Sequence, residues 1–536
     1  MKKQLLNLLL VFVCFFSNAQ EEDAWVFFTD KENVQASIEN PISILTQRAL
    51  DRKQRHNISI DERDVPVNEN YIDQIKATEG LTVFAKSKWF NCIYVRGIQE
   101  TIEDLTDLDF VSEIQFADRN LNGSRQAEVQ QHKFELENTT IDFEYGNTFN
   151  QVDMINADAL HQANYTGEGL FVAVMDSGFP NVDTIGAFQR LRDNNDLSAF
   201  SYDFVDRNPN VHAFTGNSHG TRVLSDMAGF IQDEFVGTAP DAMYVLFRTE
   251  DVASEMPVEE SYWVEAAERA DSLGVDVINT SLGYKGYDNP NYSYTSEDLD
   301  GETAFITRGS NIAFDKGMLL ITSAGNSGAS GVGAPADSPK VFSIGAVDAA
   351  GDYASFSSQG SNNQPTQKPD IVAQGSGSVV IDQNNNIVSN NGTSFSSPIL
   401  AGAITSLWQA IPNRTNSELK EYVRATGSQF TNPDNFLGYG IPDFGEALGD
   451  ALSIEEQENQ EFSIFPNPVQ NDLKIRFRFE VDQVSIQIHD ILGKLVLKQT
   501  MDVGVSKLDL RALSSGMYLL KLESTKANNT FKLIKR

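Results

Sequence analysis

Short, wholly apolar runs that each end in a small polar motif constrain the fold of this chain more than any other feature. Residues 170–175 are all apolar and lead into Asp176-Ser177-Gly178, and residues 318–321 lead into Thr322-Ser323-Ala324-Gly325-Asn326. Unbroken apolar runs of this length are typical of strands buried on both faces of a parallel sheet. Helix-like segments such as residues 264–273 alternate with them, which predicts an α/β fold with helices on both faces of a parallel sheet.

Two further motifs supply a histidine and a serine. Ser218-His219-Gly220-Thr221 opens an apolar-periodic stretch, so we expect His219 in the first turn of a helix. Asn391-Gly392-Thr393-Ser394-Phe395-Ser396-Ser397-Pro398 leads into a helix-like run, residues 397–410, with Pro398 near its start. Asp176 follows the carboxyl end of its predicted strand, where open α/β sheets place their sites. Asp, His and Ser together form a nucleophile, base and orienter set.

Asn326 adds a fourth group with a defined chemical use. It follows a predicted strand, and its side-chain amide can donate a hydrogen bond. Together with the backbone N–H of Ser394, this amide is predicted to stabilise an oxyanion that forms only during acyl transfer.

These motifs together resemble those of the subtilisin-like (subtilase) serine peptidases over about residues 145–450. The resemblance implies that Asp176 orients the imidazole of His219, which acts as general base. It implies equally that Ser394 is the nucleophile and that Asn326 is an oxyanion donor. Ser177 stands where many relatives have threonine, a departure that does not touch the triad.

The resemblance also implies a substrate-binding segment. Asn279-Thr280-Ser281-Leu282-Gly283 follows the strand-like residues 275–278 and is similar to the family's segment that pairs with an extended peptide. Ser281, Leu282, Gly283 and Gly325 are accordingly expected to bind substrate. The implied activity is that of a secreted serine endopeptidase, made as a zymogen, which hydrolyses peptide bonds of proteins and peptides through an acyl-enzyme.

Other functions are compatible with parts of this pattern. Asp-Ser-Gly alone is a common turn sequence, and the other five histidines lack a comparable context. The main alternative is a surface binding or adhesion protein that keeps the fold without turnover. An esterase or a peptide ligase would use the same acyl-enzyme and is a third hypothesis.

The amino-terminal region indicates export. Residues 1–19 have the pattern of a signal peptide, with Lys2 and Lys3, an apolar stretch and the small residues Ser17-Asn18-Ala19. The chain has two cysteines, Cys14 and Cys92, and the first would leave with the signal peptide. An internal disulfide in the exported chain and a cysteine nucleophile in residues 145–450 are therefore excluded.

Residues 20–125 are predicted to form a separate small α+β domain. The pattern gives strand, helix, two strands, helix and strand, with the first helix over residues 42–55. By position and pattern it resembles the pro-regions of secreted subtilases, which assist folding and occlude the active site. The polar residues 126–144 are expected to form a linker that contains the processing site.

The carboxyl-terminal region has a different character. After a predicted linker, residues 451–460, residues 461–536 carry 12 basic and 8 acidic residues and alternate apolar with polar side chains. This pattern is typical of a small β-sandwich. Phe465-Pro466-Asn467-Pro468, Leu513-Ser514-Ser515-Gly516-Met517-Tyr518 and the basic end resemble the sorting domain of type IX secretion cargo in Bacteroidetes. A carbohydrate- or protein-binding module is the alternative, although the region has no Trp.

The charge of the chain limits its partners. The net charge is -34, with 75 acidic and 41 basic residues, so nucleic acid and anionic membranes are unfavourable partners. No transmembrane segment is expected beyond the signal peptide. We expect a monomer, located extracellularly or on the outer cell surface, that meets the type IX secretion machinery. No cofactor is required, and structural calcium is the one metal considered, with Glu297, Asp298 and Asp300 as the best acidic cluster.

Overall fold

The computed structural model describes residues 21–122, 139–140, 146–458, 462–477, 483–491, 493–502, 507–524 and 528–536. They form two compact units, one extending to Leu448 and one beginning at Gly449. The predicted signal peptide, and the predicted linker 126–144 apart from Thr139 and Thr140, lie outside the described residues. Among the described residues, no helix is both long enough and apolar enough to span a membrane.

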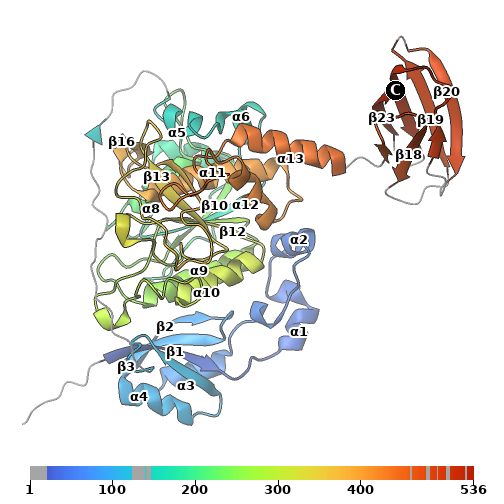
Figure 1. Ribbon diagram of the computed structural model, residues 1–536. Coiled ribbons are helices and arrows are strands. Elements are labelled where there is room, and N and C mark those ends of the chain that lie inside the picture. The colour runs from blue at the N-terminus through green and yellow to red at the C-terminus, as the bar shows by residue number, and fades with distance from the viewer. Residues whose placement is uncertain are drawn as a thin grey trace, which may run out of the picture. The chain divides into compact units, whose positions relative to one another are not determined.

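The predicted parallel sheet is confirmed and has seven strands in the order β14-β13-β12-β11-β6-β10-β7 (Figure 1). Every residue of β6 and β13 is buried, so these strands are mainly apolar, and the polar side chains of Asp176 and Ser343 within them are buried as well. In register, Val172 of β6 lies beside Val277 of β11, and Val277 lies beside Leu319 of β12. The carboxyl ends of these three strands therefore meet at one edge. The strands are β6 (Phe171–Asp176), β7 (Tyr202–Asp203), β10 (Met243–Arg248), β11 (Val277–Thr280), β12 (Leu319–Ser323), β13 (Phe342–Val347) and β14 (Ile371–Gln374).

Helices cover both faces of this sheet (Figure 1). The helices α8 (His219–Ala228) and α11 (Thr393–Ala410) pack together, and α9 (Val258–Leu273) packs with α10 (Phe305–Asp315). Every residue of α11 except Gln409 is buried, including the polar side chains of its first turn. The remaining elements are α5 (Phe149–Asp153), α6 (Asp158–Gln162), α7 (Gln189–Asp193), α12 (Asn416–Ala425), α13 (Phe444–Glu458), β5 (Thr139–Thr140), β8 (Phe230–Ile231), β9 (Phe235–Val236), β15 (Ser378–Ile381), β16 (Ile387–Asn390) and the short 3-10 turns η4 (Gly186–Phe188), η5 (Pro290–Tyr292) and η6 (Gly328–Ser330).

The amino-terminal region folds as the predicted α+β domain, with an antiparallel sheet in the order β2-β3-β1-β4. The helix expected over residues 42–55 is divided, because Thr46 caps a shorter helix and accepts a hydrogen bond from the Ala49 N–H at 3.2 Å. Two helices, α1 and α3, were not expected. The elements are β1 (Glu21–Phe28), α1 (Val34–Glu39), η1 (Pro41–Ser43), α2 (Gln47–Arg55), η2 (Glu62–Asp64), α3 (Glu69–Lys76), β2 (Leu81–Ser87), β3 (Cys92–Ile98), α4 (Gln99–Glu103), η3 (Asp104–Asp107) and β4 (Val111–Phe116).

This domain packs its sheet against α9 and α10. The Trp25 ring stacks on the Phe305 ring with centroids 4.8 Å apart, and the Trp25 indole N–H donates to Ser261 Oγ at 2.9 Å. Glu268 of α9 accepts hydrogen bonds from the backbone N–H groups of Lys88 and Trp89, each at 2.9 Å. Apolar side chains of both domains form one continuous core.

The carboxyl-terminal unit contains two antiparallel sheets, β17-β18-β21 and β20-β19-β22-β23, as a β-sandwich requires. Alternate residues of β19 and β22 are buried, including Ile486 and Leu520. Its strands are β17 (Phe462–Phe465), β18 (Asp472–Phe477), β19 (Gln483–Asp490), β20 (Leu495–Asp502), β21 (Lys507–Asp509), β22 (Gly516–Glu523) and β23 (Asn528–Lys535). The preceding helix α13 extends to Glu458, into the predicted linker 451–460.

The contact at Glu268 predicts a pH dependence of zymogen stability. Burial raises the pKa of Glu268 from 4.5 to about 7. Because the pKa is raised in the folded zymogen, this group's stabilisation is fully present below pH 4.5 and is lost as the pH rises through about 7. We expect the Tm of the zymogen to fall between pH 5 and 8, and to fall less in Glu268→Gln.

Differential scanning calorimetry of the Ser394→Ala zymogen measures this difference without self-digestion. Glu421→Gln is the matched control, because its carboxylate is largely exposed. An equal pH dependence in Glu268→Gln and in the parent would contradict the prediction.

Candidate active site

Asp176 is the last residue of β6, and its carboxylate is completely buried. Its Oδ1 accepts hydrogen bonds from the Ser177 N–H at 2.7 Å and from the Ser177 hydroxyl at 3.1 Å. The serine that replaces the family's more common threonine therefore still provides a hydroxyl donor. These bonds fix the carboxylate at the carboxyl edge of the sheet.

His219 begins α8, as its sequence context predicted. Its Nδ1 lies 2.8 Å from Asp176 Oδ1 and 3.0 Å from Oδ2. Because a carboxylate only accepts hydrogen bonds, this contact places the proton on Nδ1 and makes Nε2 the acceptor nitrogen. The ring centroid of His219 lies 5.7 Å from that of Phe395, so the imidazole lies next to the start of α11.

Asn217 connects the Asp176 and His219 segments. Its side-chain Oδ1 accepts from the His219 N–H at 2.8 Å and lies 3.1 Å from Ser177 Oγ. One amide oxygen thus holds the turn after β6 against the first turn of α8. No sequence pattern pointed to Asn217, apart from its position two residues before His219.

Ser394 lies in the first turn of α11, which begins at Thr393 and not at Ser397 as expected. Pro398 therefore lies inside the helix, where it lacks the N–H that would bond the Ser394 carbonyl four residues earlier. The Ser281 hydroxyl donates to that carbonyl instead, at 2.9 Å. Ser394 Oγ lies 3.3 Å from the Ser281 carbonyl oxygen, so these two residues are linked through both groups.

Asn326, three residues beyond β12, is held by Thr393. Its Oδ1 accepts from the Thr393 N–H and from the Thr393 hydroxyl, both at 2.9 Å. Since a backbone N–H can only donate, Oδ1 is assigned to that side and Nδ2 remains as the donor group of the amide. The Thr393 hydroxyl also accepts from the Gly325 N–H at 3.1 Å.

The four residues predicted to bind substrate lie in these same two segments. Ser281 contacts Ser394 directly, and Gly325 contacts Thr393. Gly283 is exposed, whereas the Leu282 side chain is buried. The exposed backbone at Gly283 is available for pairing with an extended chain.

The acidic cluster expected at Glu297, Asp298 and Asp300 does not converge. Asp298 pairs with Arg119 at 2.6 Å, and Asp300 accepts from the Glu302 N–H at 2.9 Å within its own turn. These carboxylates stabilise the loop in which they occur.

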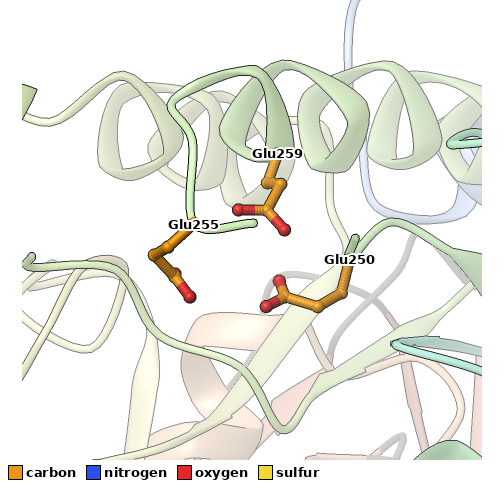
Figure 2. Close-up of side chains that lie close together, drawn as sticks. All are labelled: Glu250, Glu255 and Glu259. Atoms are coloured by element: carbon orange, nitrogen blue, oxygen red, sulfur yellow. The ribbon is translucent and has the colours of Figure 1, made fainter. Parts of the chain in front are cut away.

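A different group of acids converges in the described part of the chain. Oxygen atoms of Glu250, Glu255 and Glu259 all lie within 4.8 Å of one another. Figure 2 shows the three side chains pointing toward one another. Burial raises the pKa of Glu259, and the charges of Glu250 and Glu255 raise it further. An oxygen-only donor set is of the type that calcium prefers. The sequence did not reveal this group, because its members come from a strand end, a loop and α9.

Comparison with family models identifies three consecutive parts of the chain. Residues 23–134 match the model described as peptidase S8 propeptide domain, Bacteroidota, and residues 463–536 match the secretion system C-terminal sorting domain. Residues 167–440 match the subtilase family, just over half of the chain. The chain belongs to the subtilase family.

Two bacterial subtilisins agree with this assignment. Subtilisin E of Bacillus subtilis (strain 168) is 30% identical over 299 residues, which cover 54% of this chain and 68% of subtilisin E. The subtilisin of Bacillus pumilus is 31% identical over 299 residues, covering 54% of this chain and 94% of that protein. The solved structure of MycP1 from Mycobacterium smegmatis is 22% identical, with a TM-score of 0.47, and covers 60% of this chain and 89% of that one.

The subtilase is therefore a secreted serine endopeptidase with an amino-terminal pro-region and a type IX sorting domain. The predicted family, fold class, enzyme class and secretion to the extracellular space or cell surface are confirmed. The family match to the tail favours sorting over the alternative of a carbohydrate- or protein-binding module.

The hydrogen bonds of Thr393 predict that its hydroxyl group supports catalysis. We expect Thr393→Val to lower kcat about 10-fold with little change in KM, because the Asn326 amide loses a partner that fixes its orientation. Thr393→Ser keeps the hydroxyl and is expected to retain most activity. Steady-state kinetics on a peptide substrate measure both variants. Equal losses in the two variants would contradict a role for the hydroxyl.

Proposed function

We propose that Asp176, His219, Ser394 and Asn326 hydrolyse peptide bonds through an acyl-enzyme. The observation that carries the proposal is the 2.8 Å contact between His219 Nδ1 and Asp176 Oδ1, beside the first turn of α11. This contact sets the imidazole tautomer in which Nε2 can take a proton from the Ser394 hydroxyl.

In the first step, Ser394 Oγ attacks the substrate carbonyl while His219 Nε2 accepts the serine proton. The tetrahedral intermediate collapses when the C–N bond breaks, and His219 returns the proton to the departing amine. The Asp176 carboxylate stabilises the imidazolium that exists between these two events. In the second step, water attacks the acyl-enzyme with the same base, which releases the acid product and restores Ser394.

Asn326 supports both steps as an oxyanion donor. The Nδ2 group of Asn326 and the Ser394 N–H at the amino end of α11 donate to the developing negative charge. Thr393 holds the Asn326 amide through its opposite oxygen, so the donor is already oriented before the charge appears.

Substrates are proteins and peptides bound in an extended conformation. Ser281, Leu282 and Gly283 continue β11 at the edge of the sheet, and Gly325 lies on the other side of the nucleophile. A peptide backbone that pairs with the exposed Gly283 would bring its carbonyl to Ser394. The enzyme acts as a monomer on these substrates.

The boundaries predicted from sequence complete the proposal. Residues 1–19 are the signal peptide, residues 20–125 the inhibitory pro-region and residues 126–144 the linker that is cut on activation. Residues 145–450 are the peptidase, and residues 451–460 join it to the sorting domain, residues 461–536, which engages the type IX secretion machinery. The division between Leu448 and Gly449 supports the predicted end of the peptidase near residue 450.

Two substitutions test the catalytic assignment. We expect Ser394→Ala to lower kcat by at least about 10,000-fold, because the nucleophile is lost. Asn326→Leu is expected to lower kcat about 100- to 1,000-fold, which is the effect of removing an oxyanion-hole donor from subtilisin. Initial rates with a fluorogenic peptide measure both.

Asn363→Leu is the control for the second substitution, because Asn363 is exposed. Wild-type kcat in Ser394→Ala or in Asn326→Leu would contradict the assignment of the residue concerned.

Catalysis requires no cofactor, and calcium has a structural role only. We expect a chelator to lower the Tm of the peptidase and to leave kcat at 25 °C unchanged in the folded protein. Calorimetry and initial rates on the same sample measure the two effects. A kcat that falls while circular dichroism shows an intact fold would contradict this division.

A further inference from the structure

Residues 46–58, called the α2 arm below, bind the peptidase at the edge opposite the active site. The Thr46 N–H donates to the Ser272 carbonyl at 3.0 Å. Arg48 donates to the carbonyls of Gly169 and Gly274 at 2.9 and 3.0 Å. These acceptors precede β6 and β11, whose far ends carry Asp176 and Ser281. The five residue steps from Asp276 to Ser281 span about 16 Å, which is the distance along β11 between the arm and the active site.

A buried network of charges forms the centre of this contact. Arg52 and Lys53 of the arm both bind Asp271, with Lys53 Nζ 2.9 Å from Asp271 Oδ1. Lys53 also pairs with Asp64 at 3.2 Å, and Lys316 pairs with Asp64 at 2.7 Å. All five side chains are at most 1% exposed.

The charges of the two partners complement each other. The peptidase contributes Asp271 and Lys316, and the pro-region contributes Arg52, Lys53 and Asp64. Burial alone would raise the pKa of Asp271, but the charges of Lys53 and Arg52 outweigh it and lower the pKa. Removing one member of such a network leaves another buried charge without compensation, which is strongly unfavourable.

The shape of the peptidase surface also fits the arm. Gly274 and Gly317, which follow α9 and α10, both have positive φ angles, 85° and 89°. A Cβ on Gly274 would lie 2.6 Å from the Ala49 backbone nitrogen, and one on Gly317 would lie 2.1 Å from Ile58 Cδ1. The arm thus packs where these two helix ends lack side chains. Its His56 ring lies 5.8 Å from the Trp408 ring of α11.

This contact is separate from the other attachment of the pro-region. The sheet of the pro-region binds the sides of α9 and α10 through Trp25 and Glu268. Figure 1 shows α2 well apart from the β1–β4 sheet, alongside the peptidase. The arm therefore adds a second area of contact. It adjoins that of the sheet at Ser272, whose hydroxyl accepts from Lys88 Nζ at 2.7 Å, and it is far from the active site.

We propose that the α2 arm is a latch that keeps the pro-region bound to the peptidase after the linker has been cut. The inference rests on the proposed role of residues 20–125 as an inhibitory pro-region. Cutting the linker removes only the covalent tether, whereas the buried charges and the packing at both glycines remain in place.

A controlled cut tests the latch directly. The recognition sequence of an unrelated site-specific protease is inserted between Gln130 and Gln131 of full-length Ser394→Ala protein, labelled at its amino terminus. After complete cleavage, fluorescence anisotropy on serial dilution gives the dissociation constant of the pro-region. We expect Arg52→Ala/Lys53→Ala to weaken binding about 100-fold, because Asp271 loses both partners.

Arg55→Ala/Lys76→Ala is the matched control. It removes the same charge from exposed positions of the pro-region and is expected to change binding less than about 3-fold. Equal dissociation constants for Arg52→Ala/Lys53→Ala and for the parent would overturn the latch. So would immediate loss of the cut pro-region from the parent protein.

A milder substitution keeps the test decisive if the double variant unfolds. Arg48 is partly exposed and lies outside the buried network, so Arg48→Ala is expected to fold. Loss of its bonds to Asp276 and to two backbone carbonyls should weaken binding about 10-fold. Unchanged binding in Arg48→Ala, with the double variant unfolded, would also overturn the latch.

The same cut in protein that retains Ser394 distinguishes a failure of the latch from a failure of the proposed catalytic residues. We expect the parent to remain inhibited after cleavage and Arg52→Ala/Lys53→Ala to gain peptidase activity on dilution. Absence of activity in every freed peptidase would contradict the proposed catalytic residues, whereas the anisotropy result would still decide the latch, because binding is measured without turnover.

Discussion

The parallel pairing of β6, β11 and β12 is the constraint on which the rest of the site depends. It brings the carboxyl ends of three strands to one edge, so that Asp176, Ser281 and Asn326 come from distant parts of the sequence to one place. Both faces of the sheet are covered, which explains why its strands are mostly apolar. The polar residues needed for chemistry begin where the strands end.

The start of α11 completes this edge by burying polar groups with partners. Pro398 leaves the Ser394 carbonyl without its helical donor, and the Ser281 hydroxyl replaces it. Thr393 binds the Asn326 amide by both its N–H and its hydroxyl. The nucleophile and the oxyanion donor are thus fixed by bonds that the sheet and the helix make to each other. Such hydrogen bonds hold catalytic groups in place before substrate arrives.

The same architecture separates catalysis from control. The active site occupies the carboxyl edge of the sheet, whereas the α2 arm binds at the amino edge, next to Asp271 and Lys316. Between these edges, α9 carries Glu268 and the residues that receive the pro-region sheet. The pro-region can therefore hold the peptidase at positions that substrate never occupies.

The sequence predicted those features that depend on local patterns. The apolar run before Asp176 located its strand, and the motif around His219 located the start of a helix. The start of α11 was placed too late, because its first turn is polar yet buried, so periodicity gave no signal there. Glu250, Glu255 and Glu259 were missed because only the fold brings them together. Arg52 and Lys53 were not singled out, because their partner Asp271 is more than 200 residues away in the sequence.

Covalent labelling tests most directly whether Ser394 is the nucleophile. Peptidase freed of its pro-region would be treated with a fluorophosphonate, digested and mapped by mass spectrometry. The account predicts a single adduct on Ser394, with reaction strongly reduced in His219→Ala, because the imidazole activates the hydroxyl. An adduct on another residue, or none on protein that cleaves peptides, would contradict the assignment of Ser394 as the nucleophile.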